Sequence, residues 1–290
     1  MQPLFGYRVL DLTNVLAGPF CCHQLAHLGA EVIKVENPKG GDLARQLGAD
    51  PSLNAANMGA SFLAQNAGKK SVTLNLKDNL DRNRFLELVR TADVVVENFR
   101  PGVMTRLSLD FEVLKSVNPR LVYCAISGFG QDGPLASYPA YDQIIQGMSG
   151  VMSITGAPDT APYRVGYPLA DTVGGLTAAM AINGALANKN RQATFIDISM
   201  LESVLATMGW AVSNLLVAGK SPEPIGNNNV TASPSGTFST RDGLINIAAN
   251  KQEQFEQLCL LLDCPQWVDD LRFSHRQARL DNREALSGLI

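Results

Sequence analysis

The sequence predicts an α/β protein with a doubly wound parallel sheet in a large domain, followed by a smaller α+β domain. Short β-branched runs alternate with amphipathic helical stretches through the first half. Near residue 220 the composition shifts to Pro, Asn and Ser. With 290 residues, of which 46% are hydrophobic, the chain can bury more than one core. We expect a large domain over 1–219, a linker or loop over 220–234 and a partial small domain over 235–290.

Six strands are expected in the large domain, each a short run rich in Val, Ile or Leu. They cover residues 8–12, 31–36, 71–76, 93–98, 121–127 and 193–200. Amphipathic stretches such as "DNLDRNRFLELVRTA" are predicted as the helices between them. The sixth strand leads into "LESVLATMGWAVSNLLVAG", predicted as one long apolar helix that ends at Gly219.

The small domain is predicted from two patterns that follow the linker. "TFSTRDGLINIAA" predicts a hairpin that turns at Asp242-Gly243, and "QEQFEQLCLLLD" predicts a helix. The last residues, "NREALSGLI", are typical of a helix and carry no cap or polar tail. We therefore expect a chain that is cut short, without a closing segment.

Charge and cysteine usage exclude several classes of partner. A net charge of −3 and a pI near 5.7 provide no basic field for nucleic acid or an anionic membrane. No apolar run reaches the ~18 residues of a membrane span, and the first strand leaves no room for a leader. Five scattered cysteines without a CxxC pair indicate reduced thiols and a cytoplasmic protein, with neither disulfides nor zinc.

The first turn, "DLTNVLAGPF", lies where a doubly wound sheet binds ligands. It has one glycine instead of GxGxxG, so Glu36 at the end of the second strand is only a weak match to a nicotinamide site. A tight turn before a helix that starts at Pro19 explains Gly18-Pro19 equally well.

The histidines offer little catalytic chemistry. His23 and His27 are four residues apart on a predicted helix, but no third metal ligand is evident, so we expect no metal. No GxSxG elbow supplies a serine for a triad with these or with His275. A serine hydrolase is therefore disfavoured.

Asp171 is the single carboxylate of "PYRVGYPLADTVGGLTAAM" and has two interpretations. Aspartate is a favoured helix N-cap, and a helix is predicted to follow it. Alternatively, Asp171 takes part in the chemistry of the protein. The helix is rich in small residues, which lowers its helix propensity but lets a neighbour approach closely. That neighbour is a backbone segment, a ligand or a dimer partner.

Several ordered blocks together resemble the class III CoA-transferase family, which includes formyl-CoA transferase and the carnitine CoA-transferases. The blocks include "GYRVLDLTNVLAGPF", "LGAEVIKVENPKGGD", "ADVVVENFRPGVMTRLSLDFEVLKSVNPRLVYCAISGFGQDGP" and "PYRVGYPLADTVGGL", and the likeness runs from Gly6 to the end. The resemblance implies a Rossmann-like large domain. It also implies a homodimer of interlocked rings, closed by a C-terminal segment that this sequence lacks.

In this family the acid matching Asp171 is the nucleophile. It attacks an acyl-CoA to give an aspartyl anhydride and then an aspartyl-CoA thioester, from which an acceptor carboxylate collects CoA. A free aspartate has a pKa of about 3.9, so we expect Asp171 to be ionised at neutral pH without a general base. The resemblance also implies a closing loop, and "GNNNVTASPSG" stands where formyl-CoA transferase has a run of glycines.

The resemblance implies a CoA site and a substrate site, with CoA as a substrate and no tightly bound cofactor. Arg106 is expected to bind a phosphate of CoA. Leu16 replaces a glutamine of formyl-CoA transferase, which disfavours formyl and oxalyl transfer. The residues implied for CoA are Val15, Leu16, Ala17, Leu74, Lys77, Asn98, Phe99 and Arg106.

Substrate preference follows the same resemblance. Relatives similar around "TGAPDTAPYRVGYPLAD" handle small dicarboxylic acids, so a succinyl-CoA-type donor is expected, with Arg164 for a distal carboxylate or for a structural ion pair. The nearest rival is an α-methylacyl-CoA racemase, whose catalytic histidine is replaced here by Tyr141. Tyrosine is a poor base at neutral pH, which favours transfer, although Tyr141-Asp142 also reads as a helix start with the ring in the core. A truncated chain that binds CoA without turnover remains a third hypothesis.

Overall fold

The computed structural model describes residues 2–290, which pack into two units. The first unit runs to Val151 and resumes over Arg164–Lys220; the second comprises Met152–Tyr163 and Ser221–Ile290. The chain thus leaves the first unit after Val151 and returns to it at Arg164. We expected residues 152–163 in the large domain, but they pack with the second unit.

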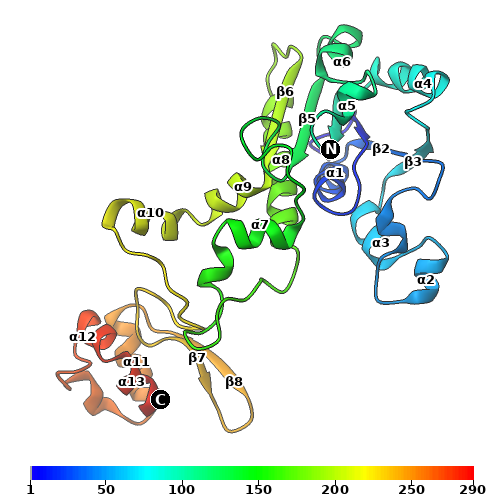
Figure 1. Ribbon diagram of the computed structural model, residues 1–290. Helices are drawn as coiled ribbons and strands as arrows, with labels where there is room; N and C mark the ends of the chain where they lie inside the picture. The colour runs from blue at the N-terminus through cyan, green and yellow to red at the C-terminus, as the bar shows by residue number, and fades with distance from the viewer. Residues whose placement is uncertain (1) are drawn as a thin grey trace. The chain divides into compact units, whose positions relative to one another are not determined.

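A six-stranded parallel sheet forms the centre of the first unit, as the sequence predicts (Figure 1). Its strands run in the order β3-β2-β1-β4-β5-β6, with every pairing parallel. Their bounds are β1 Arg8–Asp11, β2 Glu31–Glu36, β3 Lys70–Thr73, β4 Val94–Glu97, β5 Val122–Ser127 and β6 Thr194–Ser199. The order reverses between β1 and β4, so the carboxyl ends of these two strands flank the crevice where such sheets bind ligands.

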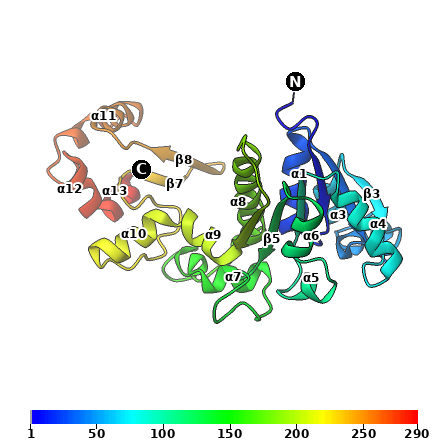
Figure 2. The ribbon, with the colours of Figure 1, turned by 90° about the horizontal axis from the view of Figure 1, so that it is seen from above.

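Helices cover both faces of this sheet, which explains why the central strands are almost continuously apolar. One face packs Val9, Val96 and Cys124 against α1 (Ala17–His27) and α8 (Leu169–Leu186). The other packs Leu10, Val95 and Tyr123 against further helices. The helices of that second face are α4 (Asn79–Val89), α5 (Val103–Arg106) and α6 (Phe111–Val117). Figure 2 shows α1 and α8 side by side.

The remaining helices of the first unit are short and follow loops. Their bounds are η1 Leu43–Gln46, α2 Pro51–Ala55, α3 Ala60–Asn66, α7 Asp142–Met148, α9 Met200–Thr207 and α10 Gly209–Ala218. The single long helix predicted over 201–219 is wrong, because the chain breaks at Met208, ahead of Gly209, and bends by 76° there. Among the described residues no single helix could span a bilayer, and only this bent pair reaches the required length and apolar character.

The second unit contains the predicted hairpin and helices. β7 (Ser235–Ser239) pairs antiparallel with β8 (Leu244–Ala248), and the turn closes from the Thr240 N–H to the Gly243 carbonyl at 2.9 Å. The other elements are η2 Val151–Ile154, where the chain crosses between units, α11 Gln252–Leu261, η3 Pro265–Val268, α12 Arg276–Asp281 and α13 Arg283–Leu289. Phe255, Phe273 and Leu286 form its core.

Three arginines of α12 and α13 hold the segment that precedes β7. Arg276 donates to the Thr231 carbonyl at 2.9 and 3.1 Å, Arg279 to the Ser233 carbonyl at 3.0 Å and Arg283 to the Asn229 carbonyl at 2.6 Å. "GNNNVTASPSG", the stretch expected at the position of a closing loop, is thus tied to its own unit at alternate residues. These bonds give the segment a defined conformation.

Candidate active site

Asp171 faces a small pocket at the carboxyl ends of the central strands. The pocket has a volume of about 210 Å³. Its lining comes from the loop after β1, the loop after β4, the end of β5 and the starts of α7, α8 and α9. The lining residues are Asn14, Val15, Leu16, Ala17, Asn98, Phe99, Ile126, Ser127, Gly128, Ala140, Tyr141, Asp171 and Met200. The Asp171 carboxylate therefore lies at the crevice between the carboxyl ends of β1 and β4, where the strand order predicts ligand binding.

The N-cap interpretation of Asp171 is wrong. Helix α8 begins at Leu169, so Asp171 lies in its first turn and leaves its carboxylate uncommitted to the helix end. Asp142, from α7, does the capping instead: its Oδ1 accepts the N–H groups of Ala170 at 2.7 Å and Asp171 at 3.4 Å. The Gln146 side chain donates to the other oxygen of Asp142 at 2.7 Å.

Burial, together with the smaller effect of the neighbouring negative charge of Asp142, raises the pKa of Asp171 to about 7. The expectation that Asp171 is fully ionised at neutral pH is therefore wrong. The carboxylate and the carboxylic acid coexist near pH 7. A desolvated carboxylate is a better nucleophile than a hydrated one, and it needs no partner base.

The small residues of α8 admit other parts of the same chain. A side chain on Gly175 would meet the Ala17 carbonyl and the Cys21 N–H of α1, at 2.5 and 3.3 Å from its Cβ. A side chain on Gly174 would meet Met200 of α9 at 2.9 Å. Gly175 therefore accommodates the backbone of α1, one of the neighbours considered from the sequence, and Gly174 accommodates the Met200 side chain.

The loop after β1 brings Val15, Leu16 and Ala17 to the pocket together. Its backbone is clamped by Asn98, whose side chain accepts the Asn14 N–H at 2.8 Å and donates to the Asn14 carbonyl at 2.9 Å. Both ends of the Asn98 amide are therefore used in holding the backbone of this loop. Asn14 itself was missed from the sequence.

A second pocket of about 320 Å³ adjoins the first, and Asn14 and Phe99 line both. It lies between the ends of β2, β3 and β4, and three residues expected to bind CoA, Leu74, Lys77 and Phe99, line it. Two lysines line it, Lys77 and the unforeseen Lys39. The full lining is Leu12, Asn14, Val35, Glu36, Asn37, Lys39, Gly41, Leu74, Asn75, Leu76, Lys77, Phe99, Val103 and Leu107. Asn14 and Lys39 each follow the carboxyl end of a strand, and this position was the only signal for them in the sequence. Asparagine and lysine are common in loops, so the residue types themselves gave no signal.

Two of the expected site residues lie outside both pockets. Arg106 is exposed on α5, between Val103 and Leu107, which do line the second pocket. Arg164 is exposed, and its Nε donates to the Val165 carbonyl at 3.2 Å. Tyr141 lines the first pocket and starts α7, but its ring is 74% exposed, so its expected place in the core is wrong.

The alternative cofactor sites find no geometric support. Glu36 is engaged by Arg45, by the Ser71 hydroxyl and by the Asp42 N–H, which hold its pKa at about 2 against the opposing effect of burial, so it has no free oxygen for a ribose. His23 and His27 place their Nε2 atoms 2.9 Å apart. No group of three or more His, Cys, Asp or Glu that could hold a metal occurs within residues 2–290.

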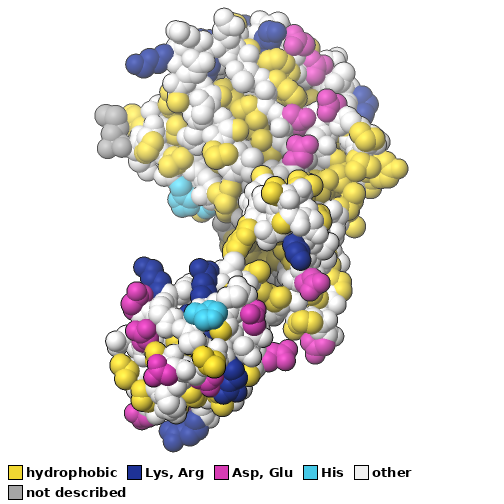
Figure 3. Space-filling view, turned by 90° about the vertical axis from the view of Figure 1, so that its left-hand side faces the viewer, with side chains coloured by type: hydrophobic (Ala, Val, Ile, Leu, Met, Phe, Trp, Pro, Cys, Tyr) yellow, Lys and Arg dark blue, Asp and Glu magenta, His cyan; other side chains and the backbone are white. Residues whose placement is uncertain are grey.

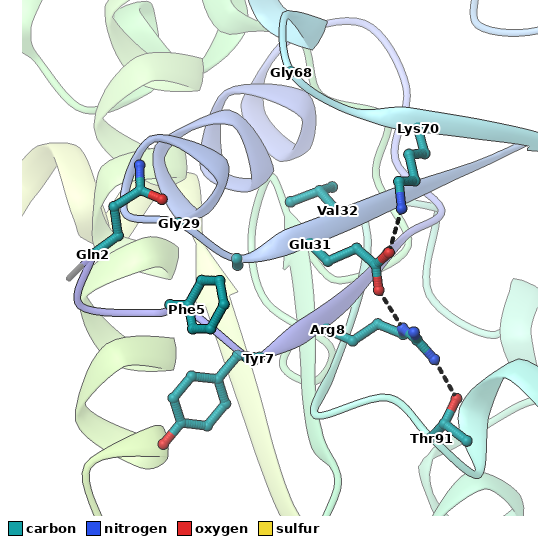
Figure 4. Close-up of a pocket in the computed structure, with 12 residues that line it drawn as sticks. Gln2, Phe5, Tyr7, Arg8, Gly29, Glu31, Val32, Gly68, Lys70 and Thr91 are labelled. Carbon is teal, nitrogen blue, oxygen red and sulfur yellow. Dashed lines mark hydrogen bonds and ion pairs between the residues drawn. The ribbon is translucent and has the colours of Figure 1, made fainter.

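A larger cavity, of about 640 Å³, lies at the amino ends of the strands (Figure 4). Its charged side chains satisfy one another: Glu31 pairs with Lys70 at 2.5 Å and with Arg8 at 2.6 Å, and Arg8 also donates to Thr91. Ligands of open α/β sheets bind at the opposite edge. The candidate site is therefore the smaller pocket that holds Asp171.

Comparison with known proteins identifies one family. The model of CoA-transferase family III matches residues 4–290. An acetyl-CoA:oxalate CoA-transferase of Acetobacter aceti is 43% identical, over 99% of this chain and 74% of that protein. A succinate–glutarate CoA-transferase of Agrobacterium fabrum is 40% identical, over 99% and 73%.

Solved structures agree with the sequence comparison. A CAIB/BAIF family protein from Brucella suis has a TM-score of 0.86 and 38% identity, covering 99% of this chain and 76% of that one. Rv3272 from Mycobacterium tuberculosis has a TM-score of 0.85 and 33% identity, covering 100% and 75%. This chain thus spans about three quarters of the length of these relatives.

Proposed function

Because this chain belongs to CoA-transferase family III, we propose that Asp171 is the nucleophile with which it moves CoA from an acyl-CoA to a carboxylic acid. One observation carries the proposal. Asp171 is a carboxyl group with a pKa of about 7, in a pocket that adjoins a second, lysine-lined pocket. A nucleophile and a place for its thioester substrate lie next to each other.

The steps need no further catalytic acid or base. An oxygen of Asp171 attacks the thioester carbonyl, the carbon–sulfur bond breaks, and CoA leaves as a thiolate. The thiolate attacks the aspartyl carbonyl of the resulting anhydride, which releases the donor acid as a carboxylate and leaves an aspartyl-CoA thioester. An acceptor carboxylate then attacks this thioester and collects the CoA in the same two stages, which restores Asp171.

Lys39 and Lys77 support placing the nucleotide end of CoA in the second pocket, because phosphate groups there meet two cations. Phe99 and Asn14 line both pockets, so the thiol-bearing arm passes between them. Val15, Leu16 and Ala17 line the reacting end, and Leu74 lines the nucleotide end. Arg106 directly precedes Leu107, which lines the second pocket, and is the cation proposed for the phosphates at its rim.

We propose a succinyl-CoA-type donor and a small dicarboxylic acceptor. The relatives' names support this class: one acts on oxalate and acetyl-CoA, another on succinate and glutarate. A pocket of about 210 Å³ suits a short acid. Tyr141 contributes a hydroxyl-bearing ring to the pocket, and Arg164 is the cation proposed for a distal carboxylate.

The test is intact-protein mass spectrometry after mixing with succinyl-CoA, followed by hydroxylamine treatment and peptide mapping. We expect an acyl or CoA adduct on the peptide that contains Asp171. Asp171→Asn should abolish the adduct while the protein stays folded, because Asp142 and not Asp171 caps α8. Asp159→Asn, an exposed acid of the second unit, is the matched control and should keep the adduct.

A folded sample that forms no adduct with succinyl-CoA or with a panel of other acyl-CoAs would contradict the proposal. Incorporation of deuterium at the α-carbon in heavy water would then assign racemase chemistry. Binding of CoA without either reaction would leave a CoA-binding chain that does not turn over.

We further propose that the partner of this chain is a second copy of itself. Large apolar side chains are exposed on the first unit, and Figure 3 shows such side chains gathered on its surface. The helices α8 and α10 contribute Leu176, Met180, Trp210, Leu216 and Val217. Light scattering during size-exclusion chromatography should give twice the mass of the chain, and a monomer at micromolar concentration would contradict the proposal.

The compartment is proposed from thiol chemistry. Four of the five cysteines are buried and none forms a disulfide. Burial raises the pKa of the Cys22 and Cys124 thiols well above the usual range, which makes them unreactive. Such thiols suit a reducing compartment, for which we propose the cytoplasm.

A further inference from the structure

Val15 has an unusual backbone conformation at the reacting end of the site. Its φ is +68°, in the left-handed region that a β-branched residue rarely adopts. The same residue lines the pocket of Asp171, together with its neighbours Leu16 and Ala17. Strained residues persist only where their surroundings hold them, so the source of that constraint bears on the reaction.

Asp42 holds this residue directly. It precedes η1 and is 1% exposed. Its Oδ1 accepts the Val15 N–H at 3.0 Å and the Ala44 N–H at 2.9 Å. Val15 and Asp42 are 27 residues apart in sequence, so the bond ties the first turn to the loop after β2.

A buried cation keeps Asp42 in place. Lys34 Nζ lies 2.9 Å from Asp42 Oδ2 and donates to the Thr13 carbonyl at 2.7 Å. On its other side Lys34 is 3.9 Å from Asp11, which pairs with Lys69 at 2.8 Å. These four side chains, each 2% exposed or less, form a charge-balanced network of two anions and two cations.

Each of the four side chains also contacts the backbone of the loop after β1 or of the start of α1. Asp11 accepts the Thr13 N–H at 2.9 Å, Lys34 binds the Thr13 carbonyl, and Lys69 donates to the Pro19 carbonyl at 2.9 Å. Asp42 supplies the contact to Val15 itself. A buried ionic network is weak evidence for stability, but its contacts can select one conformation.

We propose that Asp42 is a positioning residue of the transfer reaction, which holds Val15 in its left-handed conformation so that the loop after β1 faces Asp171 correctly. Asp42 does not touch the reacting atoms. It acts through one hydrogen bond to the Val15 N–H, and the network supplies the charge balance that allows its carboxylate to be buried. The proposal rests on the proposed function of Asp171.

Two double variants test that hydrogen bond. Asp42→Ala alone leaves Lys34 with an unbalanced buried charge and is expected to fold poorly. Lys34→Met/Asp42→Asn and Lys34→Met/Asp42→Ala both remove one cation and one anion. They differ in whether residue 42 has an oxygen that accepts the Val15 N–H and the Ala44 N–H, so exchange of the Val15 amide is compared with exchange of the Ala44 amide.

A third variant controls for the loss of a partly buried, ion-paired carboxylate next to another strand of the sheet. Asp93 accepts the Arg8 N–H at 3.0 Å and pairs with Arg191 at 2.7 Å. It directly precedes β4, at the amino ends of the strands, opposite the pocket. Asp93→Asn should lower the melting temperature and leave the reaction rate unchanged.

Two readouts decide the proposal: the single-turnover rate of adduct formation on Asp171, and hydrogen exchange of the Val15 amide. We expect Lys34→Met/Asp42→Asn to stay within about 3-fold of the parent rate, and Lys34→Met/Asp42→Ala to lose about 30-fold, because small misplacements near reacting groups have effects of this order. The half-saturating CoA ester concentration should change by less than about 3-fold. The Val15 amide should exchange faster only in the alanine variant.

Equal adduct rates and equal Val15 exchange in the two double variants would overturn the proposal. So would a loss of rate in Asp93→Asn as large as in the alanine variant, because the rate would then report general destabilisation. A parent chain that forms no adduct would contradict the role of Asp171 instead. In that case Val15 exchange alone, which needs no turnover, decides whether Asp42 positions the loop.

Discussion

Asp142 and Asp171 divide two roles that the sequence offered to a single aspartate. Asp142 satisfies the first N–H groups of α8, and its negative charge adds to the burial that disfavours ionisation of Asp171. An aspartate that caps a helix normally stands at the N-cap position of that same helix and accepts its first backbone N–H groups. Here the cap comes from α7, so a carboxylate in the first turn of α8 stays available for chemistry.

The pKa of Asp171, about 7 in the folded chain, predicts a pH dependence. Only the carboxylate is nucleophilic, so the rate of adduct formation should rise with pH through about 7 and then level off. Asp142→Asn keeps an oxygen for the α8 cap but removes the negative charge, and should therefore move the midpoint to lower pH. Single-turnover rates between pH 5 and about 9 measure both profiles. A parent rate that does not change across this pH range would contradict the prediction.

The raised pKa of Asp171 also makes the stability of the folded chain depend on pH. The folded pKa of Asp171 lies above the model value of 3.8, so the folded state binds the proton more tightly than the unfolded chain. The corresponding contribution to stability is present below about 3.8 and is lost as the pH rises toward about 7. Asp171→Asn should remove this part of the pH dependence of unfolding.

At the scale of the element, α8 and α1 show how a helix with poor propensity can be well placed. Gly174 and Gly175 cost helix propensity, yet both are buried where another segment comes close. The close approach brings the start of α1, and with it Ala17, beside the pocket that Asp171 lines. Helix packing thus determines the shape of the site.

Two glycines of α8 provide an internal comparison. Gly175→Ala places a methyl group 2.5 Å from the Ala17 carbonyl and should lower the free energy of unfolding by about 1–3 kcal/mol. Gly184→Ala meets nothing within 4 Å and should raise it by about 0.5–1 kcal/mol through helix propensity. Urea titration followed by circular dichroism measures both. Equal effects of the two substitutions would mean that α1 does not constrain Gly175.

At the scale of the whole molecule, each unit contains its own core and one of the two tryptophans. Trp210 lies on α10 of the first unit and Trp267 on η3 of the second. In a Trp210→Phe background, fluorescence therefore reports the second unit alone. Arg279 of α12 is 1% exposed, and its hydrogen bonds connect several segments of that unit.

Arg279→Met should destabilise the second unit. Arg279 donates to the carbonyls of Ser233 and Phe273 and to Gln252, at 2.8 to 3.0 Å, and stacks over Phe255. Loss of its donors leaves buried oxygens unpaired, which should cost about 2–4 kcal/mol. Urea denaturation followed by Trp267 emission measures the change. Arg272→Met, at an exposed ion pair, is the control and should leave the urea midpoint nearly unchanged.

Sequence pattern alone determined the α/β class, the six parallel strands and the family, because apolar periodicity and ordered motifs are local properties. Only the tertiary structure decided which residues meet. Asp142 caps α8 from 28 residues away, Asp42 reaches Val15 across 27 residues, and α1 occupies the space that the glycines of α8 leave. Burial then shifted the pKa of Asp171, and burial depends on every element packed around a group.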